Sequence, residues 1–456
     1  MHRLFHIVSY ALTFAVQETR FFTTWPRSFL ITRTARQLVY LLGILTIAMR
    51  TPPLLMLWAT LCFSVSVVAE DDLLDSDTVI TVADVPNGSL TPRPFRQEVR
   101  SLYIPLADHY AALVAYERYR DTMVHADFKL QQMKNWDLLR ALFQSGEAEM
   151  AYVMSPLAMD MYHEKSHFRW IGLMHRDGNA LAINDLLDMH IHLPANRIDR
   201  KPDHKLADAL KLVHRQTGVP TEIGMPHLLS THTVVLYKYL KDHGLQLSLN
   251  HFQAKEVLAI PVAPPKAPIF LRGKSNRAKP AAFEQSLPWA DIVETQGYGH
   301  VAWYSKDVMP WRGGHVECIA LATKKAIKDK QKAVGEVMHA IHKAGQDIER
   351  ARIEGGQALE DIVTIVRKHI PMHTPAAIRA SLDPKLRVIN YQNLNIDKPG
   401  LKLIMDTAVE GKILKAPVDI DAFADTQFTY PLNEPPLSES PLFETPLTNY
   451  TGGADE

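Results

Sequence analysis

Short apolar strands alternate with amphipathic helices in this chain, and this alternation constrains the fold more than any other feature. In the first stretch, strand candidates at 100–104, 128–133 and 150–154 are separated by helix candidates at 107–119 and 135–146. Apolar residues recur at helical spacing in both helix candidates, and Gly146 follows the second as a stop signal. A strand–helix–strand order of this length is typical of a parallel sheet in an α/β protein.

A second stretch repeats the pattern, with a helix that begins after Ser230 and ends at Gly244. Its strand candidates lie at 222–225, 257–262, 291–294 and 300–304, and 257–262 is an apolar run. From Ala320 onward we expect helices, with an apolar stripe at Val334, Val337, Met338, Ile341 and Ile348. Two successive α/β units predict two lobes, and small ligands favour the interface between such units.

Charge and composition exclude several classes of protein. The 456 residues carry 50 Lys and Arg against 50 Asp and Glu, so the formal net charge is zero. A general nucleic-acid binder would carry a strongly basic face, so no nucleic-acid partner is expected. A hydrophobic fraction of 46% excludes disorder as the main state, and two cysteines exclude a disulfide scaffold.

Residues 49–69 have the pattern of a secretory signal peptide. A short basic start is followed by an apolar run at 54–68 and by small residues that end at Ala69. The run is shorter than the roughly 20 residues of a membrane span, so we expect export with cleavage near Ala69. An uncleaved anchor is the alternative interpretation.

The segments around this signal have no predicted core. Residues 1–48 are interpreted as a gene-model extension, and the alternative is a second hydrophobic segment that tethers the protein. Residues 70–98 are acidic and then rich in Pro, Gly, Ser and Thr, which is typical of a linker. Residues 431–456 have few apolar side chains and are expected to form a disordered tail.

Most strong catalytic and cofactor motifs are missing from the sequence. It contains no phosphate-binding GxxxxGK[ST] loop, no GxGxxG, no HExxH, no GxSxG and no CxxC. His315, Glu317 and Cys318 could offer metal ligands, but one histidine and one cysteine make no closed zinc site. We therefore predict no cofactor and no metal, and leave open whether a metal ion binds near Glu284.

Two helix starts carry side chains suited to ligand binding. Trp136 follows the N-cap candidate Asn135, and His232 follows Ser230 and Thr231. The first turn of a helix presents free N–H groups and a partial positive charge, which attract anions. Simple capping is the alternative interpretation of both sequences.

Five segments in order resemble the nitrate/bicarbonate/sulfonate-type solute-binding proteins of ABC importers. The resemblance covers roughly residues 99–425. It is carried by Lys134–Leu142 with Ser145–Ala151, Met154–Leu157, Arg176–Ile183, Thr231–Leu240, and the group formed by Ala263–Pro265, Ala282–Glu284 and Leu287–Trp289.

The resemblance implies a type II periplasmic-binding-protein fold, which has two α/β lobes joined by a hinge around a ligand cleft. The first part of lobe 1 would span 99–183, and lobe 2 would span 184–298. Residues 299–430 would return to lobe 1 and end in C-terminal helices. The implied ligand-binding residues are Trp136, Ser155, Asn179, His232 and Glu284.

The implied function is that of a periplasmic solute-binding protein rather than an enzyme. Such a protein would capture a small anionic solute and deliver it to an ABC permease with its ATPase. The segment between Glu284 and Trp289 has extra residues relative to the family pattern, so the identity of the solute does not carry over. The alternatives are a ligand-sensing module that acts with a histidine kinase and an enzyme similar to the thiamine-pyrimidine synthases.

Overall fold

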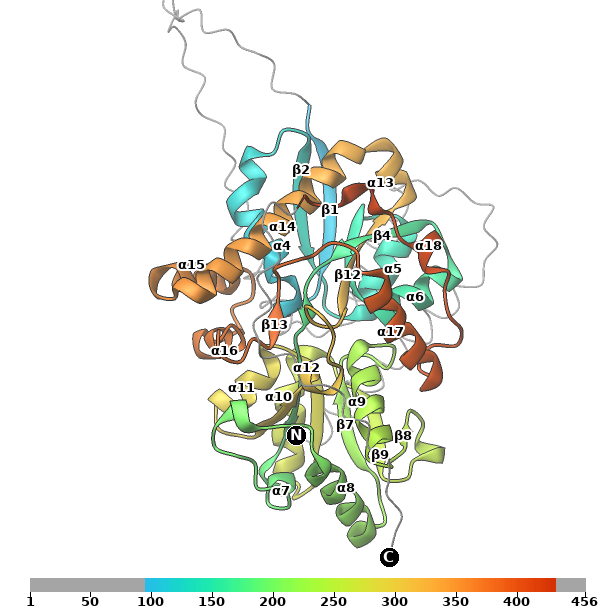
Figure 1. Cartoon of the computed structure of the whole chain (residues 1–456), viewed down its shortest axis with the longest axis vertical. Helices are drawn as coiled ribbons and strands as arrows, with labels where there is room; N and C mark the ends of the chain where they lie inside the picture. The colour runs from blue at the N-terminus through green and yellow to red at the C-terminus, as the bar shows by residue number, and fades with distance from the viewer. Residues whose placement is uncertain (1–94, 432–456) are drawn as a thin grey trace, which may run out of the picture. The chain divides into compact units, whose positions relative to one another are not determined.

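The computed structural model describes residues 95–431, and its strands form two main sheets (Figure 1). The expectations for residues 1–48 and 49–69, and those for most of 70–98 and 431–456, lie outside the described residues. Within 95–431, no helix is both long and apolar enough to cross a membrane.

The first sheet has five strands in the order β2-β1-β3-β12-β4. Strands β1, β2 and β3 run parallel, and β12 is antiparallel to both β3 and β4. The bounds are β1 Gln97–Tyr103, β2 Ala126–Gln132, β3 Met150–Met154, β4 Phe168–Leu173 and β12 Cys318–Thr323. This sheet, with the helices that pack on it, is called the first lobe.

The second sheet has six strands in the order β11-β6-β10-β7-β9-β8. Strands β7, β8, β9 and β10 run parallel, and β6 is antiparallel to β10 and β11. The bounds are β6 Asn179–Ile183, β7 Thr221–Met225, β8 Leu247–Ser248, β9 Val257–Pro261, β10 Ala282–Ser286 and β11 His300–Tyr304. This sheet and its helices are called the second lobe.

The chain passes between the two sheets twice, after β4 and again after β11. On the first passage, β5 (Arg176–Asp177) pairs with β13 (Ile389–Asn390), which comes from the C-terminal part of the chain. The second sheet contains β6 and β11, which lie outside the range 184–298 expected for lobe 2. The two-lobed α/β architecture and the helical C-terminal part agree with the predicted fold class.

Helices cover the sheets and continue beyond the last strand of the first lobe (Figure 1). The helices up to the return to the first lobe are α4 Tyr110–Tyr119, α5 Trp136–Ser145, α6 Ser155–Glu164, α7 Asp185–Asp188, α8 His204–Thr217, α9 Thr231–Asp242, α10 Ala267–Ser275, α11 Trp289–Thr295 and α12 Ser305–Val308. Those after the return are α13 Lys324–Asp329, α14 Gln331–Glu354, α15 Gly356–His369, α16 Pro375–Ser381, α17 Lys398–Glu410 and α18 Ile420–Phe423. Single 3-10 turns lie at η2 Ala107–His109, η3 Arg120–Thr122, η4 Arg197–Asp199, η5 His251–Gln253, η6 Pro264–Lys266 and η7 Thr426–Phe428.

The long helix α14 supplies much of the core of the first lobe. It packs against α4, β1 and β2, and the predicted apolar stripe of α14 is fully buried there. Burying an apolar side chain of this size contributes about 1.5–3 kcal/mol. The buried stripe therefore holds α14 against strands β1 and β2.

Two secondary-structure predictions were wrong. Residues 291–294 belong to helix α11, because Trp289 and Val293 are one helical turn apart and both are buried. Residues 320–323 belong to strand β12, and the helices begin only at Lys324. Both segments are short. The first contains the β-branched pair Ile292 and Val293, and the second begins with the apolar residues 320–322, and periodicity over so few residues does not separate a strand from a helix.

The carboxylate of Glu336 on α14 accepts three backbone hydrogen bonds at the start of β2. The N–H groups of Val124, His125 and Ala126 donate to it over 2.7, 2.7 and 2.8 Å. We expect Glu336→Ala to lower the free energy of unfolding by about 1.5–3 kcal/mol, because hydrogen bonds to a charged acceptor are lost. Urea denaturation followed by circular dichroism measures the change.

A matched control is Glu410→Ala. Glu410 pairs with Lys241, and about half of each side chain is exposed. Exposed ion pairs contribute about 0–1 kcal/mol, so the midpoint of denaturation should barely move. Equal losses in the two variants would contradict the role given to Glu336.

Candidate functional site

The chemistry-bearing side chains gather where strands of both sheets end. Asp108 follows β1, Ser155 follows β3, His232 follows β7, and Ser286 is the last residue of β10. In α/β sheets, ligands bind at the carboxyl ends of parallel strands, because the loops there come from several strands at once. All four side chains are fully buried.

Two helix starts meet at this place, one from each lobe. Ser155 begins α6 and Thr231 begins α9, and their hydroxyl oxygens are 3.4 Å apart. Asn135 caps α5 by accepting from the N–H of Leu138, and Ser230 caps α9 by accepting from the N–H of Thr233. Both predicted caps are confirmed.

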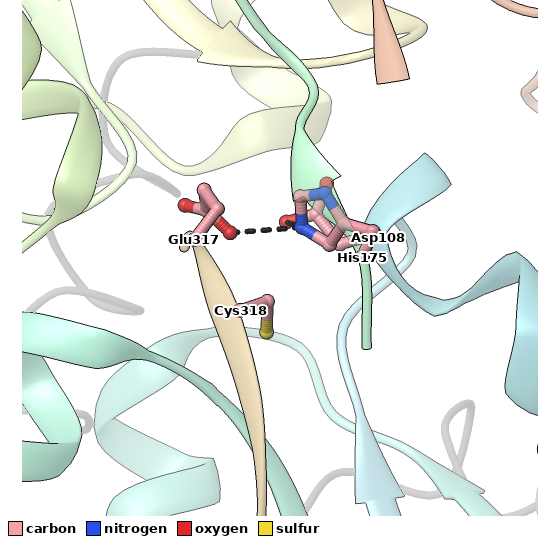
Figure 2. Close-up of side chains that lie close together, drawn as sticks. All are labelled: Asp108, His175, Glu317 and Cys318. Carbon is pink, nitrogen blue, oxygen red and sulfur yellow. Dashed lines mark hydrogen bonds and ion pairs between the residues drawn. The ribbon is translucent and has the colours of Figure 1, made fainter. Parts of the chain in front are cut away.

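A histidine between two carboxyls forms the centre of the site (Figure 2). The Nε2 atom of His175 lies 2.9 Å from Oε2 of Glu317 and 3.5 Å from Oδ2 of Asp108. Burial alone would lower the pKa of His175, but the charge of Asp108 and the hydrogen bonds to both carboxyls raise it to about 10. Burial likewise opposes ionisation of Asp108, yet His175 holds the pKa of this carboxyl below its usual value.

Ser286 joins this group to His232 of the second lobe. Its hydroxyl donates to Oδ2 of Asp108 over 2.9 Å, because an ionised carboxylate can only accept. The 3.0 Å contact between Ser286 Oγ and His232 Nε2 then requires His232 Nε2–H to donate. The Nδ1 atom of His232 is left without a proton, and it lies 3.6 Å from Oε1 of Glu317.

Burial keeps several of these groups neutral. Desolvation lowers the pKa of His232 to about 3, so its imidazole is uncharged at neutral pH. Desolvation, helped by the charge of Asp108, raises the pKa of Glu317 to about 7. Desolvation followed by repulsion from Glu317 raises the pKa of Glu284 well above its ordinary value. The site thus holds carboxyl groups that ionise reluctantly.

Unpartnered polar atoms are concentrated here. Buried polar groups are nearly always hydrogen-bonded, so each exception needs an explanation. The residues with a buried side-chain atom that makes no hydrogen bond of ordinary geometry include Trp136 (Nε1), Asn179 (Oδ1 and Nδ2), His232 (Nδ1), Glu284 (both oxygens), Asp108 (Oδ1) and Glu317 (Oε1). Four of the five residues predicted to bind ligand are in this set.

Other side chains, which were not among the predicted ligand-binding residues, connect the predicted residues to one another. The rings of Trp136 and His109 are 6.4 Å apart, and Nε2 of His109 lies 3.2 Å from Sγ of Cys318. Asn179 lies close enough to Glu317 to lower the pKa of that carboxyl.

The two remaining predicted residues lie beside Glu317 and Ser286. The backbone N–H of Ser155 donates to the carbonyl of Glu317 over 2.9 Å. Glu284 lies two residues before Ser286 on β10, which places both side chains on one face of the strand.

Sequence reasoning missed Asp108, His109, His175 and Ser286. None stands in a recognisable motif, and their places after strand ends were the signal that could have indicated them. Glu317 and Cys318 were considered as metal ligands together with His315. The structure instead turns His315 Nε2 to Ser305 Oγ, 2.9 Å away, and brings Asp108 and His175 to Glu317.

Gly178 positions His175. Its φ is +91°, and a β-carbon there would lie 2.9 Å from His175 Nδ1. Gly178→Ala should therefore cost about 1–2 kcal/mol for the left-handed backbone and a further ~1–3 kcal/mol for the clash. Thermal unfolding measures the loss of stability.

Gly146→Ala is the control for backbone strain. Gly146 also has a positive φ, +82°, but a β-carbon there would meet nothing within 4 Å. Gly146→Ala should therefore lose only the stability that a left-handed backbone conformation costs. If both variants lose the same stability, Gly178 does not act through His175.

Glu284 should destabilise the ligand-free protein at neutral pH. Neither carboxyl oxygen has a partner, and such a buried polar group costs about 1–3 kcal/mol. Glu284→Leu should raise the free energy of unfolding by about that amount. Folding raises the pKa of Glu284, so this carboxyl loses its proton at a lower pH in the unfolded protein than in the folded one. The wild type therefore loses stability as the pH rises from 4 to 7. The gain in stability from Glu284→Leu should be larger at pH 7 than near pH 4.

Gln285→Leu is the control on the same strand. Gln285 Nε2 donates to the carbonyl of Val262 over 2.9 Å, so its removal should lower stability. Chemical denaturation at the two pH values measures both variants. A loss of stability in Glu284→Leu would show that its carboxyl has a partner in the folded protein.

Three of the solved structures with a similar fold are bacterial binding proteins. A zinc-bound ligand-binding component of an ABC-type import system from Staphylococcus aureus matches at 18% identity and a TM-score of 0.56, covering 73% of this chain and 98% of that chain. The periplasmic nitrate-binding protein NrtA from Synechocystis PCC 6803 matches at 15% identity and a TM-score of 0.57, covering 72% and 84%. The alkanesulfonate-binding protein SsuA from Xanthomonas axonopodis pv. citri, bound to MOPS, matches at 11% identity and a TM-score of 0.53, covering 72% and 98%.

These likenesses confirm the fold class and the resemblance predicted from the sequence. No curated protein matches the chain significantly. The model of the NMT1-like family matches residues 94–358. Since that match covers more than half of the 456 residues, the chain belongs to the NMT1-like family.

Proposed function

We propose that this protein is the exported solute-binding component of an ABC importer. It captures a small polar solute between its two lobes in the periplasm and delivers it to an inner-membrane permease driven by an ATPase. One observation carries the proposal. Trp136, Asn179, His232 and Glu284 each bury a polar atom without a partner where the lobes meet, and a bound solute would satisfy those atoms.

The charge of the site argues against the simple anionic solute expected from the helix starts. The protonated His175 is already paired with Asp108 and Glu317. An anion would be buried beside these carboxyls and Glu284, and the charge of His175 is already shared between two of them.

The unpartnered atoms instead favour a solute that donates hydrogen bonds or carries a positive charge. Acceptors slightly outnumber donors. The acceptors are His232 Nδ1 and one oxygen each of Asp108, Asn179, Glu284 and Glu317, and the donors are Trp136 Nε1, Asn179 Nδ2, His175 Nδ1 and the protonated oxygen of Glu284. Unpartnered acceptors that face one another are satisfied by a hydrogen-bond donor or a positive charge. We therefore propose a solute that presents N–H or O–H groups, or a positive charge, to these residues.

Binding fits the hydrogen bonds better than catalysis does. Ser286, His232 and Glu317 have the residue types of a nucleophilic triad, but their protons are in the wrong places. The Ser286 hydroxyl donates to Asp108, so His232 cannot accept its proton. The 3.6 Å between His232 Nδ1 and Glu317 is also longer than a hydrogen bond.

The test is a thermal-shift screen of the purified protein against amines, amides, pyrimidines, sulfonates and oxyanions. A solute that binds only the folded state stabilises it by about 2.7 kcal/mol at a hundredfold excess over Kd. We expect donor-rich or cationic solutes to raise the melting temperature. If no solute of any class does so, solute capture is excluded.

His232→Ala should weaken the binding of the best solute by about 0.5–1.5 kcal/mol for a neutral donor and by about 1.5–3 kcal/mol for a cation, because one hydrogen bond to the uncharged imidazole is lost. Isothermal titration calorimetry measures it. His300→Gln is the control, because His300 lies in a half-exposed pair with Asp185. If His232→Ala binds the solute as tightly as the wild type does, His232 does not contact the solute.

Delivery to a permease has a separate test. Cells that lack the gene should lose uptake of the labelled solute, and the wild-type gene should restore it, whereas the His232→Ala gene should not. Normal uptake in the deletion strain, with binding intact in the purified protein, would exclude transport and favour the sensing alternative.

A further inference from the structure

Four donor groups of three chemical types surround one point beside the polar residues described above. Ligand atoms of Asp108, His175, Glu317 and Cys318 all lie within 4.8 Å of one another, and the four side chains are fully buried (Figure 2). Zinc-type ions bind at about 2.0–2.3 Å, so donors around one ion lie at most about 4–4.6 Å apart. The 4.8 Å bound is slightly above this range, so a shift of a few tenths of an ångström would bring the four donors around a single ion.

The donor set distinguishes between metals. Calcium and magnesium prefer oxygen ligands throughout, whereas here an imidazole nitrogen and a thiol sulfur accompany the two carboxyls. Nitrogen and sulfur donors together with carboxylates suit zinc and neighbouring first-row divalent ions.

Each carboxyl in the group has one oxygen atom that is free to bind a metal ion. Asp108 Oδ1 and Glu317 Oε1 are buried and have no hydrogen-bond partner. These free oxygens are a second observation, independent of the clustering, that indicates a missing ligand.

Neighbouring side chains already hold the donors in place. His109 Nε2 contacts Cys318 Sγ at 3.2 Å, and Ser286 donates to Asp108 at 2.9 Å. Outer contacts of this kind orient metal ligands in metalloproteins. His175 Nε2 now shares a hydrogen with Glu317 at the centre of the group, and a metal ion would replace that hydrogen.

We propose that Asp108, His175, Glu317 and Cys318 bind a divalent first-row metal ion, with zinc as the best match. The ion supplies the positive charge that the acceptor-rich site lacks. The inference rests on the proposed function, because it names a ligand of the same interlobe site.

The experiment uses the metal alone as its probe. The purified protein is freed of metal, titrated with Zn²⁺ by calorimetry and with Co²⁺ by absorption spectroscopy. We expect one tightly bound ion per chain and a sulfur-to-cobalt charge-transfer band in the near ultraviolet. His175→Gln should weaken zinc binding more than about 100-fold, since even outer contacts cost 10–100-fold.

Cys318→Ser should abolish the charge-transfer band and should still bind zinc, but more weakly than the wild type. If His175→Gln fails to fold, Cys318→Ser alone tests the metal site. His300→Gln is the matched control, since it removes a half-exposed imidazole and should bind zinc like the wild type. Thermal unfolding of each metal-free variant confirms that it is folded.

Two results would overturn the inference. Zinc binding unchanged in both His175→Gln and Cys318→Ser would place the ion elsewhere. No tight binding to the wild type would exclude the site, and an organic solute that stabilises the same protein would leave the proposed function intact. Conversely, tight zinc binding with normal uptake in the deletion strain would support the metal site and exclude transport.

Discussion

The rest of the site depends on a buried histidine held between two buried carboxyls. A carboxylate removed from water must be paired, and leaving one unpaired costs about 3–5 kcal/mol. His175 pairs Glu317 and Asp108 at once, and it lies on the first passage between the sheets while Glu317 lies on the second. The interaction therefore ties together the two places where the lobes are covalently joined.

The second lobe completes the arrangement through hydrogen bonds to the first. Besides Ser286 to Asp108, the indole N–H of Trp289 donates to the carbonyl of Pro105 over 3.0 Å, and the N–H of Ala107 donates to Leu287 over 2.7 Å. All of these contacts surround the segment that follows β1. Any movement that opens this region must break these hydrogen bonds, so the entry of a ligand here would be coupled to movement of the lobes.

Local features of the site could be predicted, and pairings across the chain could not. The caps of α5 and α9 and the stripe on α14 are set by residues three or four apart, which the sequence displays directly. The contact between Ser286 and Asp108 joins residues 178 positions apart, and that between His175 and Glu317 joins residues 142 apart. Such partners are chosen by the fold, and no spacing rule in one sequence identifies them. The strand at 320–323 was missed for a related reason, since β12 exists because it pairs with β3 and β4.

Helix α17 affects how freely the lobes can separate. It packs against α6 of the first lobe and α9 of the second. At its end, a β-carbon on Gly411 would lie 2.9 Å from the ring of Tyr237 on α9, so this contact is tight. Any movement that separates the lobes must break one of these contacts, so α17 adds to the free-energy cost of separating them. If a ligand binds only when the lobes move, its apparent affinity would scale with the population of the competent arrangement, and α17 would change that affinity from outside the site.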